Sequence, residues 1–200
     1  QIREINAMTH IENELIDEAC GRVMNYLAQR DWLSSTDIFF TTDHGEMQGD
    51  FGLLFKGPYH VDALMRLPFI WRPAPSQNIV PGEVTEPVGH VDLAKTFCNI
   101  AGVNPPEYCE GDVLPLSNVE ARQQDRDCVL TEWDSEHGPV DMHLKSIYHR
   151  DGWLCTAYEK SHLYDGSEGE LYDMNNDPDQ LSNLWEDPAS QSRKQLLLDM

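Results

Sequence analysis

The stretch that decides the fold is Asp37-Ile38-Phe39-Phe40-Thr41-Thr42, followed at once by Asp43-His44-Gly45. The β-branched and aromatic side chains of the first six residues are typical of a buried strand, and Asp43-His44-Gly45 has the composition of a turn. Upstream, apolar residues recur every three or four positions, which places them on one stripe of a long helix. They are Ile11, Leu15, Ile16, Ala19, Val23, Tyr26 and Leu27. A helix, a buried strand and a polar turn in this order predict an α/β fold of the doubly wound type.

Two further elements continue this pattern towards the middle of the chain. Residues 67–71 form a second short apolar run that Pro73 ends, which predicts another strand. The segment that begins at His90 has helical periodicity and stops at Gly102, a residue type that often follows the end of a helix. Residues 104–125 are rich in Pro, Gly, Asn and acidic side chains, so we expect a linker on the surface.

The last third of the chain has a different pattern, with short β-prone runs separated by turn signals. These runs predict a small antiparallel sheet, closed by a helix from about Pro188 to the C-terminus. We therefore predict two domains, an α/β part at residues 1–120 and an α+β subdomain at residues 121–200. The β-prone runs are residues 128–133, 144–148, 153–158 and 170–172.

Composition excludes several classes of function. The chain has 200 residues with 35 acidic and 14 basic side chains, a formal net charge of −21, so nucleic acid is not an expected partner. Membrane-spanning helices need roughly 18 consecutive apolar residues, and no run approaches that length. Gln1 opens a charged string rather than a signal peptide. The five cysteines form no Cys-x-x-Cys pair, which indicates ordinary thiols in a reducing compartment and favours the cytoplasm.

The candidate chemistry lies in the turn after the first strand. In an open α/β sheet, ligands bind at the carboxyl ends of the strands, where Asp43 and His44 can converge on one cation if Gly45 lets the chain turn. An anionic oxygen beside a neutral imidazole suits manganese, zinc or magnesium better than calcium. Lys56 follows between two glycines, and an ammonium near a cation site is the usual partner of a phosphate or sulfate oxygen. His60 is close enough in sequence to line the same pocket.

Simpler interpretations exist for each of these residues. An Asp-His-Gly sequence at a strand end is often an Asx-type turn, and a single lysine is most often solvated. Glu46 and Asp50 fit a solvated loop face better than a metal site. Several other histidines show no metal-ligand spacing; they are His10, His60, His137, His143, His149 and His162.

A resemblance over nearly the whole chain decides between these interpretations. The sequence resembles the C-terminal half of the sulfatase family, within the alkaline phosphatase superfamily, including its phosphonate monoester hydrolase and choline sulfatase branches. The C-terminal segment around Leu171-Tyr172-Asp173 is the most specific of the matching motifs. In order, these are residues 21–27, 39–46, 54–57, 90–96 and 169–178 together with Asn183-Leu184.

The resemblance implies a fold, an activity and a set of roles. The fold is the C-terminal portion of an alkaline-phosphatase-like α/β/α sandwich, with a small antiparallel β and helix subdomain. The activity is metal-dependent hydrolysis of a small-molecule sulfate monoester, with Asp43 and His44 as ligands of a divalent metal (Mn, Ca, Mg or Zn). Lys56 would contact a non-bridging oxygen of the ester, as the catalytic and substrate-binding lysine. The formylglycine nucleophile arises from a Cys/Ser-x-Pro-x-Arg motif that these 200 residues lack, so the fragment alone is not expected to turn over substrate.

Departures from the family pattern leave alternatives open. Lys95 stands where the family usually has Pro, and Phe51 stands where His is frequent. His44, where many arylsulfatases have Asn, favours the phosphonate hydrolase or choline sulfatase branches. The alternatives are a phosphonate monoester or phosphodiester hydrolase, and a non-catalytic relative that binds an anion or a partner protein. A homo-oligomer and an exported protein also remain open.

Overall fold

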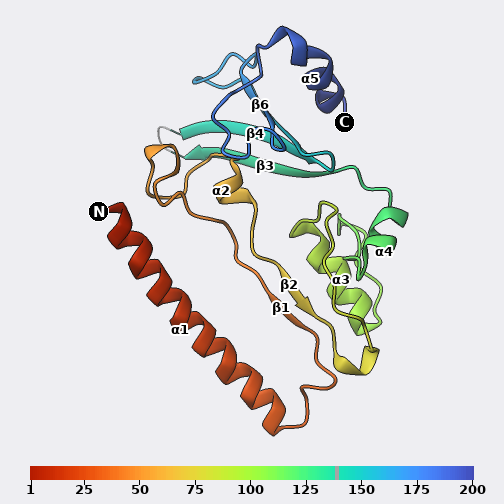
Figure 1. Cartoon of the computed structure of the whole chain (residues 1–200). Coiled ribbons are helices and arrows are strands. Elements are labelled where there is room, and N and C mark those ends of the chain that lie inside the picture. Colours follow the sequence, from red (N-terminus) through yellow and green to blue (C-terminus); the bar gives the residue numbers. More distant parts are fainter. Residues whose placement is uncertain (138–139) are drawn as a thin grey trace. The chain divides into compact units, whose positions relative to one another are not determined.

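The computed structural model describes residues 1–137 and 140–200, which form two compact units, Gln1–Pro81 and Gly82–Met200 (Figure 1). We describe each unit by itself. The boundary predicted near Ala121, between the catalytic α/β core and the C-terminal subdomain, stays a prediction.

The first unit contains the helix and the two strands that the sequence predicts. The predicted helix and strands correspond to α1 (Ile2–Gln29), β1 (Ile38–Phe40) and β2 (Ile70–Arg72). The two strands pair antiparallel, with Ile38 opposite Arg72, so they are not the parallel pair that a doubly wound unit would place side by side. Phe39 and Trp71 lie opposite each other and their rings stack at 5.1 Å, which ties the two strands together. The elements of this unit are α1 (Ile2–Gln29), β1 (Ile38–Phe40), η1 (Asp50–Gly52), α2 (Asp62–Met65), β2 (Ile70–Arg72) and η2 (Pro75–Gln77).

Helix α1 has an apolar stripe that remains exposed. None of its residues is buried, and Leu15 in the middle of the stripe is 60% exposed. A hydrogen bond of 2.9 Å from Gln48 Nε2 to Thr9 Oγ1 joins the helix to the loop before η1. The buried core of this unit is small and consists of Met47, Val61 and Leu64.

The second unit is built on a four-stranded antiparallel sheet in the order β3-β4-β5-β6, as the sequence predicts. Helix α5 (Gln191–Leu198) contacts β5 (Trp153–Tyr158), and Leu197 of that helix is buried in a core with Cys155, Leu171 and Trp185. The elements are α3 (Val91–Ala101), α4 (Asn118–Gln123), β3 (Cys128–His137), β4 (Val140–His149), β5 (Trp153–Tyr158), β6 (Gly169–Asp173), η3 (Pro188–Ser190) and α5 (Gln191–Leu198).

The expected linker at residues 104–125 contains the short helix α4, which corrects that part of the prediction. Ser117 Oγ accepts a hydrogen bond of 3.2 Å from Glu120 N, and Glu120 Oε2 accepts one of 2.8 Å from Leu116 N. This reciprocal capping is the physical reason that a helix starts in a segment of otherwise linker-like composition.

A buried ion pair fixes α3 in the second unit. Asp92, only 1% exposed, accepts hydrogen bonds of 2.6 Å from each terminal nitrogen of Arg126 and one of 2.8 Å from Asp112 N. Burial alone would raise the pKa of Asp92, but the hydrogen bonds from Arg126, Asp112 and Gly89 outweigh it and hold that pKa below its ordinary value. The carboxylate is therefore charged and paired.

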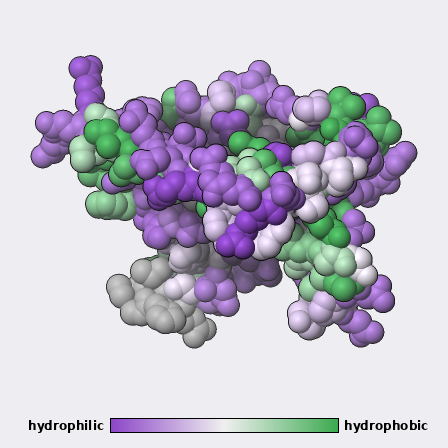
Figure 2. Space-filling view, turned by 90° about the horizontal axis from the view of Figure 1, so that it is seen from below, coloured by the Kyte–Doolittle hydropathy of each residue, from purple (hydrophilic) through white to green (hydrophobic). Residues whose placement is uncertain are grey.

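The surface agrees with the acidic composition. Figure 2 shows hydrophilic residues over most of the visible face, with separate hydrophobic patches between them. Within the described residues, none of the helices combines the length and apolar character needed to cross a bilayer.

Candidate functional site

The turn that follows β1 is held against α2 through Gly45. Its amide donates a hydrogen bond of 2.8 Å to the Leu64 carbonyl, and a Cβ on Gly45 would lie 1.9 Å from the carbonyl oxygen of Ala63. Only glycine allows this approach of two backbone segments. Because Leu64 is buried with Met47, the turn that carries Asp43 and His44 rests on the core of the unit.

The imidazole of His44 has a defined tautomer in this turn. Its Nδ1 lies 2.8 Å from the Gly45 carbonyl oxygen, which can only accept, so Nδ1 carries the proton. The lone pair is therefore on Nε2. That atom lies 3.5 Å from Asp43 Oδ2 and 2.7 Å from the Nζ atom of Lys56. The structure thus brings together the three residues that the sequence singled out.

The Asp43 carboxylate is held in the ionised state. Its Oδ1 accepts hydrogen bonds of 3.0 Å from His44 N and 3.2 Å from the Thr42 hydroxyl. The hydrogen bond from its own backbone amide is the largest cause that lowers the pKa of Asp43. Burial opposes this effect, while the hydrogen bonds from His44 and Thr42 lower the pKa further. An exposed, ionised carboxylate is the form that can bind a cation.

Lys56 reaches His44 because the intervening loop folds back on itself. Gly49 N donates a hydrogen bond of 2.7 Å to the Leu53 carbonyl, and Gly49, Phe51 and Gly52 all have positive φ. Such a conformation is accessible to glycine but costs energy for Phe51. The sharp loop explains how two residues twelve positions apart meet.

His60 has a different environment from the other predicted site residues. It is 5% exposed, and burial lowers its pKa, so the imidazole is neutral in the interior of the unit. Lys56, in contrast, is exposed. The role of His60 as a pocket wall stays a prediction.

The donor atoms present fit part of a divalent-metal site. Asp43 Oδ2 and His44 Nε2 are 3.5 Å apart, and ligand distances of about 2.0–2.2 Å let both reach one cation. The Gly45 carbonyl orients the imidazole from its far side, as outer partners of metal-binding histidines do. Among the residues that the structure describes, no group of three or more ligating side chains could hold a metal ion.

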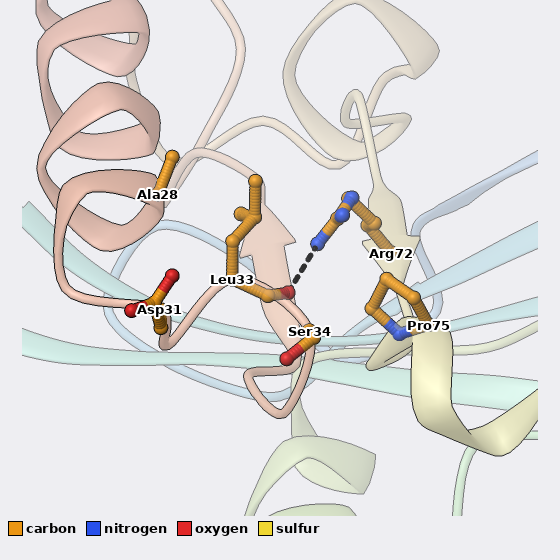
Figure 3. A pocket seen from close by; sticks show the side chains of 6 residues that line it. All are labelled: Ala28, Asp31, Leu33, Ser34, Arg72 and Pro75. Carbon is orange, nitrogen blue, oxygen red and sulfur yellow. Dashed lines mark hydrogen bonds between the residues drawn. The ribbon is translucent and has the colours of Figure 1, made fainter.

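A separate pocket lies at the other end of β1. It is lined by Ala28, Asp31, Leu33, Ser34, Arg72 and Pro75, and the Arg72 guanidinium donates a bond of 3.4 Å to the Leu33 carbonyl (Figure 3). Residues before β1 line this pocket together with Arg72 and Pro75 at the end of β2 and after it. Asp43 and His44, which follow β1, are not among the lining residues, so the pocket is not the candidate site.

Comparison with known proteins gives the family. The sequence family described as N-sulphoglucosamine sulphohydrolase, C-terminal, matches residues 49–199, three quarters of the chain. The chain belongs to the sulfatase family. The uncharacterized sulfatase YidJ of Escherichia coli is 31% identical to this sulfatase chain over 183 residues, 88% of the chain and 33% of that protein. The chain thus spans about a third of the length of the curated relatives that it matches.

Solved structures confirm the alkaline-phosphatase-like fold of this sulfatase chain. The structure of BT4656 in complex with its substrate D-glucosamine-2-N,6-O-disulfate has a TM-score of 0.76 and 25% identity, over 92% of this chain and 37% of that one. The phosphonate monoester hydrolase of Agrobacterium radiobacter also has a TM-score of 0.76, at 23% identity, over 92% and 38% of the two chains. The predicted resemblance is therefore correct.

Sequence reasoning missed the groups that support the site. The Thr42 hydroxyl and the Leu64 carbonyl hold Asp43 and Gly45. Thr42 lies within the matching segment 39–46 but was given no role, and Leu64 lies outside every matching segment. Thr42 could have been found from its place directly before Asp43, because a hydroxyl there can bond to the next side chain. The contact between Gly45 and α2 depends on tertiary packing, and no local signal reveals it.

Proposed function

We propose that the whole protein hydrolyses sulfate monoesters with the help of a divalent metal ion. The observation that carries this proposal is the convergence of the Asp43 carboxylate, the Nε2 lone pair of His44 and the Lys56 ammonium at one end of β1. Membership of the sulfatase family supports the reaction class, and the substrate complex of the BT4656 structure supports a small sulfated molecule as the ligand.

Asp43 and His44 would hold the metal, which when bound would supply Lewis-acid polarisation of the ester oxygens. The Nε2 atom has a single lone pair, so it cannot bind a cation and accept a hydrogen bond from Lys56 at the same time. Binding of a cation would therefore release the Lys56 ammonium, which could then donate to a non-bridging ester oxygen and offset the charge that develops there. The nucleophile would come from outside these 200 residues.

The test uses the full-length protein and measures sulfate release and metal content. Asp43→Ala should abolish both metal binding and turnover. Lys56→Ala should retain the metal and lower turnover by about 10²–10³-fold, the usual cost of removing one preorganised donor. Glu46→Gln, in the same turn, is the matched control and should behave as wild type. Wild-type turnover in both Asp43→Ala and Lys56→Ala would contradict these assignments.

A second candidate is hydrolysis of a phosphonate monoester or a phosphodiester. It is favoured by His44 at a position where many arylsulfatases have Asn, and the same three groups could serve a phosphorus ester. Comparing kcat/KM for an aryl sulfate, phenylphosphonate and an aryl phosphodiester discriminates the two. A full-length protein that binds metal but hydrolyses none of the three would instead be a non-catalytic relative.

A further inference from the structure

In the second unit, His143 on β4 is contacted by carboxylates at both ring nitrogens. Asp134 lies directly opposite on β3, and its Oδ1 contacts His143 Nδ1. Asp141, two residues earlier on the same strand and therefore on the same face, places Oδ1 3.0 Å from His143 Nε2. Carboxylate oxygens accept hydrogen bonds and do not donate when ionised. Both ring nitrogens must then carry protons, so this geometry belongs to the imidazolium form of His143.

The same cluster reaches the segment between β5 and β6. The second oxygen of Asp141 accepts a hydrogen bond of 3.0 Å from His162 N and lies 2.7 Å from His162 Nδ1. Glu159 N donates a bond of 2.8 Å to the His143 carbonyl. The contacts of Asp141 with His162, together with this backbone hydrogen bond, therefore connect β4 to residues 159–162.

The proton on His143 supplies a positive charge in a cluster where acidic side chains outnumber basic ones. Among the side chains that the structure describes, Glu132 on β3, Lys145 on β4 and Glu159 after β5 also face this cluster. Lys145 Nζ lies 2.8 Å from Glu159 and 3.9 Å from Glu132, so this one base is already shared by two acids. Without the proton on His143, Asp134 and Asp141 would each face a neutral ring, and the lone pair of one nitrogen would face an oxygen.

We propose that Asp134, His143, Asp141 and His162 form a proton-dependent clamp that holds the segment between β5 and β6 to the β3–β4 hairpin. When His143 loses its proton, one of its two carboxylate contacts becomes repulsive, so the ring no longer holds both Asp134 and Asp141. The bonds from His162 N to Asp141 and from Glu159 N to the His143 carbonyl do not use this proton, so they are weakened rather than broken. This clamp is independent of the proposed hydrolase activity.

The pH range of the clamp follows from the groups in it. The carboxylates of Asp134, and then of Asp141, raise the pKa of His143 above its ordinary value near 6.5. The stabilisation is thus fully present below that ordinary value and is lost as the pH rises through the raised one. Hydrogen bonds from the His162 backbone and side chain, and from His143, lower the pKa of Asp141 to about 2. Its contribution is present above about 3.9 and is lost as the pH falls towards 2.

The experiment measures amide hydrogen exchange of residues 159–165 in the full-length protein against pH, corrected for the intrinsic exchange rate. Between pH 6.5 and the raised pKa of His143, exchange should rise about tenfold per pH unit, and it should level off above that pKa. Nitrogen NMR of the His143 ring in the same protein should show the proton leaving Nδ1 or Nε2 over the same range.

Three variants separate the clamp from general destabilisation. Asp134→Asn should move the hydrogen-exchange transition and the His143 NMR transition to lower pH, because it removes one of the two carboxylates that favour the imidazolium. His143→Gln should remove the pH dependence and leave exchange fast throughout. His149→Gln, which alters a histidine on the same strand that contacts Asp151, should retain the wild-type profile. Exchange that is independent of pH in wild type would overturn the proposal. So would a His143 transition at or below 6.5.

Discussion

At the scale of single residues, Gly45 shows how the fold determines the site. Asp43 and His44 occupy their positions because the next residue has no side chain and can approach the Ala63 carbonyl. The backbone of Gly45 also serves the imidazole directly, since its carbonyl oxygen holds the proton of His44 on Nδ1. One glycine thereby sets both the place of the turn and the chemical state of its histidine.

Gly45→Ala should destabilise the first unit by about 2–4 kcal/mol, because the added methyl group must displace backbone and break the bond to Leu64. Urea unfolding of the 200-residue chain measures this change. Gly21→Ala in α1 is the control, since a Cβ there meets no atom within 4 Å. The control should be neutral or stabilising by up to about 1 kcal/mol. Equal stability of the two variants would show that the close approach of Gly45 to α2 is absent in solution.

Asp43, His44 and Lys56 could be predicted as a group from the sequence, but mainly through the family resemblance. From the residues alone, an Asx-type turn and a solvated lysine fit as well, because nothing local says that a loop will bring Lys56 back to His44. That return depends on the positive φ angles of Gly49, Phe51 and Gly52, and at Phe51 the residue type argues against such a conformation.

At the scale of elements, the strands and longer helices could be predicted because each has its own local periodicity. The antiparallel pairing of β1 with β2 could not, since the partner of a strand is set by long-range packing. The helix α4 was missed although Ser117-x-x-Glu120 is a capping-box pattern, because the surrounding Pro and Gly residues dominated the composition. The Asp92–Arg126 pair was also hidden, as the two residues are far apart in sequence.

Arg126→Met should destabilise the second unit by about 3–5 kcal/mol at neutral pH, because it leaves the Asp92 charge buried without its partner. In wild type the pKa of Asp92 is lowered, so its contribution to stability is present above about 3.9 and is lost as the pH falls through the lowered value. In the variant, burial would instead raise that pKa, and mild acid should then recover part of the loss. Urea unfolding at pH 7 and pH 5 measures both effects.

The two proteins should therefore converge as the pH falls from 7 to 5. A deficit in Arg126→Met that is the same at both pH values would mean that Asp92 is not ionised and buried in the native state. The surface variant Arg3→Met is the control and should change stability by less than about 0.5 kcal/mol.

At the scale of the whole molecule, the stripe of α1 is a continuous row of exposed apolar side chains. Ile11, Leu15, Ile16 and Val23 are 49–60% exposed. The chain spans only about a third of its curated relatives, and a two-stranded sheet such as β1–β2 is marginal by itself. We expect the rest of the full-length protein to pack against α1.

The 200-residue chain should self-associate in solution, and more strongly at high salt, where the net charge of −21 is screened. Leu15→Glu should weaken this association in the isolated chain, yet it should destabilise the full-length protein, in which Leu15 would be buried. Sedimentation of the chain and thermal unfolding of the full-length protein measure the two effects. Equal thermal stability of the full-length variant and wild type would show that α1 is not covered.

The sequential strand order of the second unit also bears on the speed of folding. Each strand from β3 to β6 pairs only with its neighbours along the chain, so its contacts close short loops. Short loops cost little chain entropy, and domains of low contact order fold quickly. Strands β1 and β2, in contrast, can pair only after the long loop from Phe40 to Ile70 has closed. During synthesis, the β3–β6 sheet would then form faster than the β1–β2 pair, although it is translated later. The pairing of β1 with β2 would limit the rate at which the chain reaches its native structure.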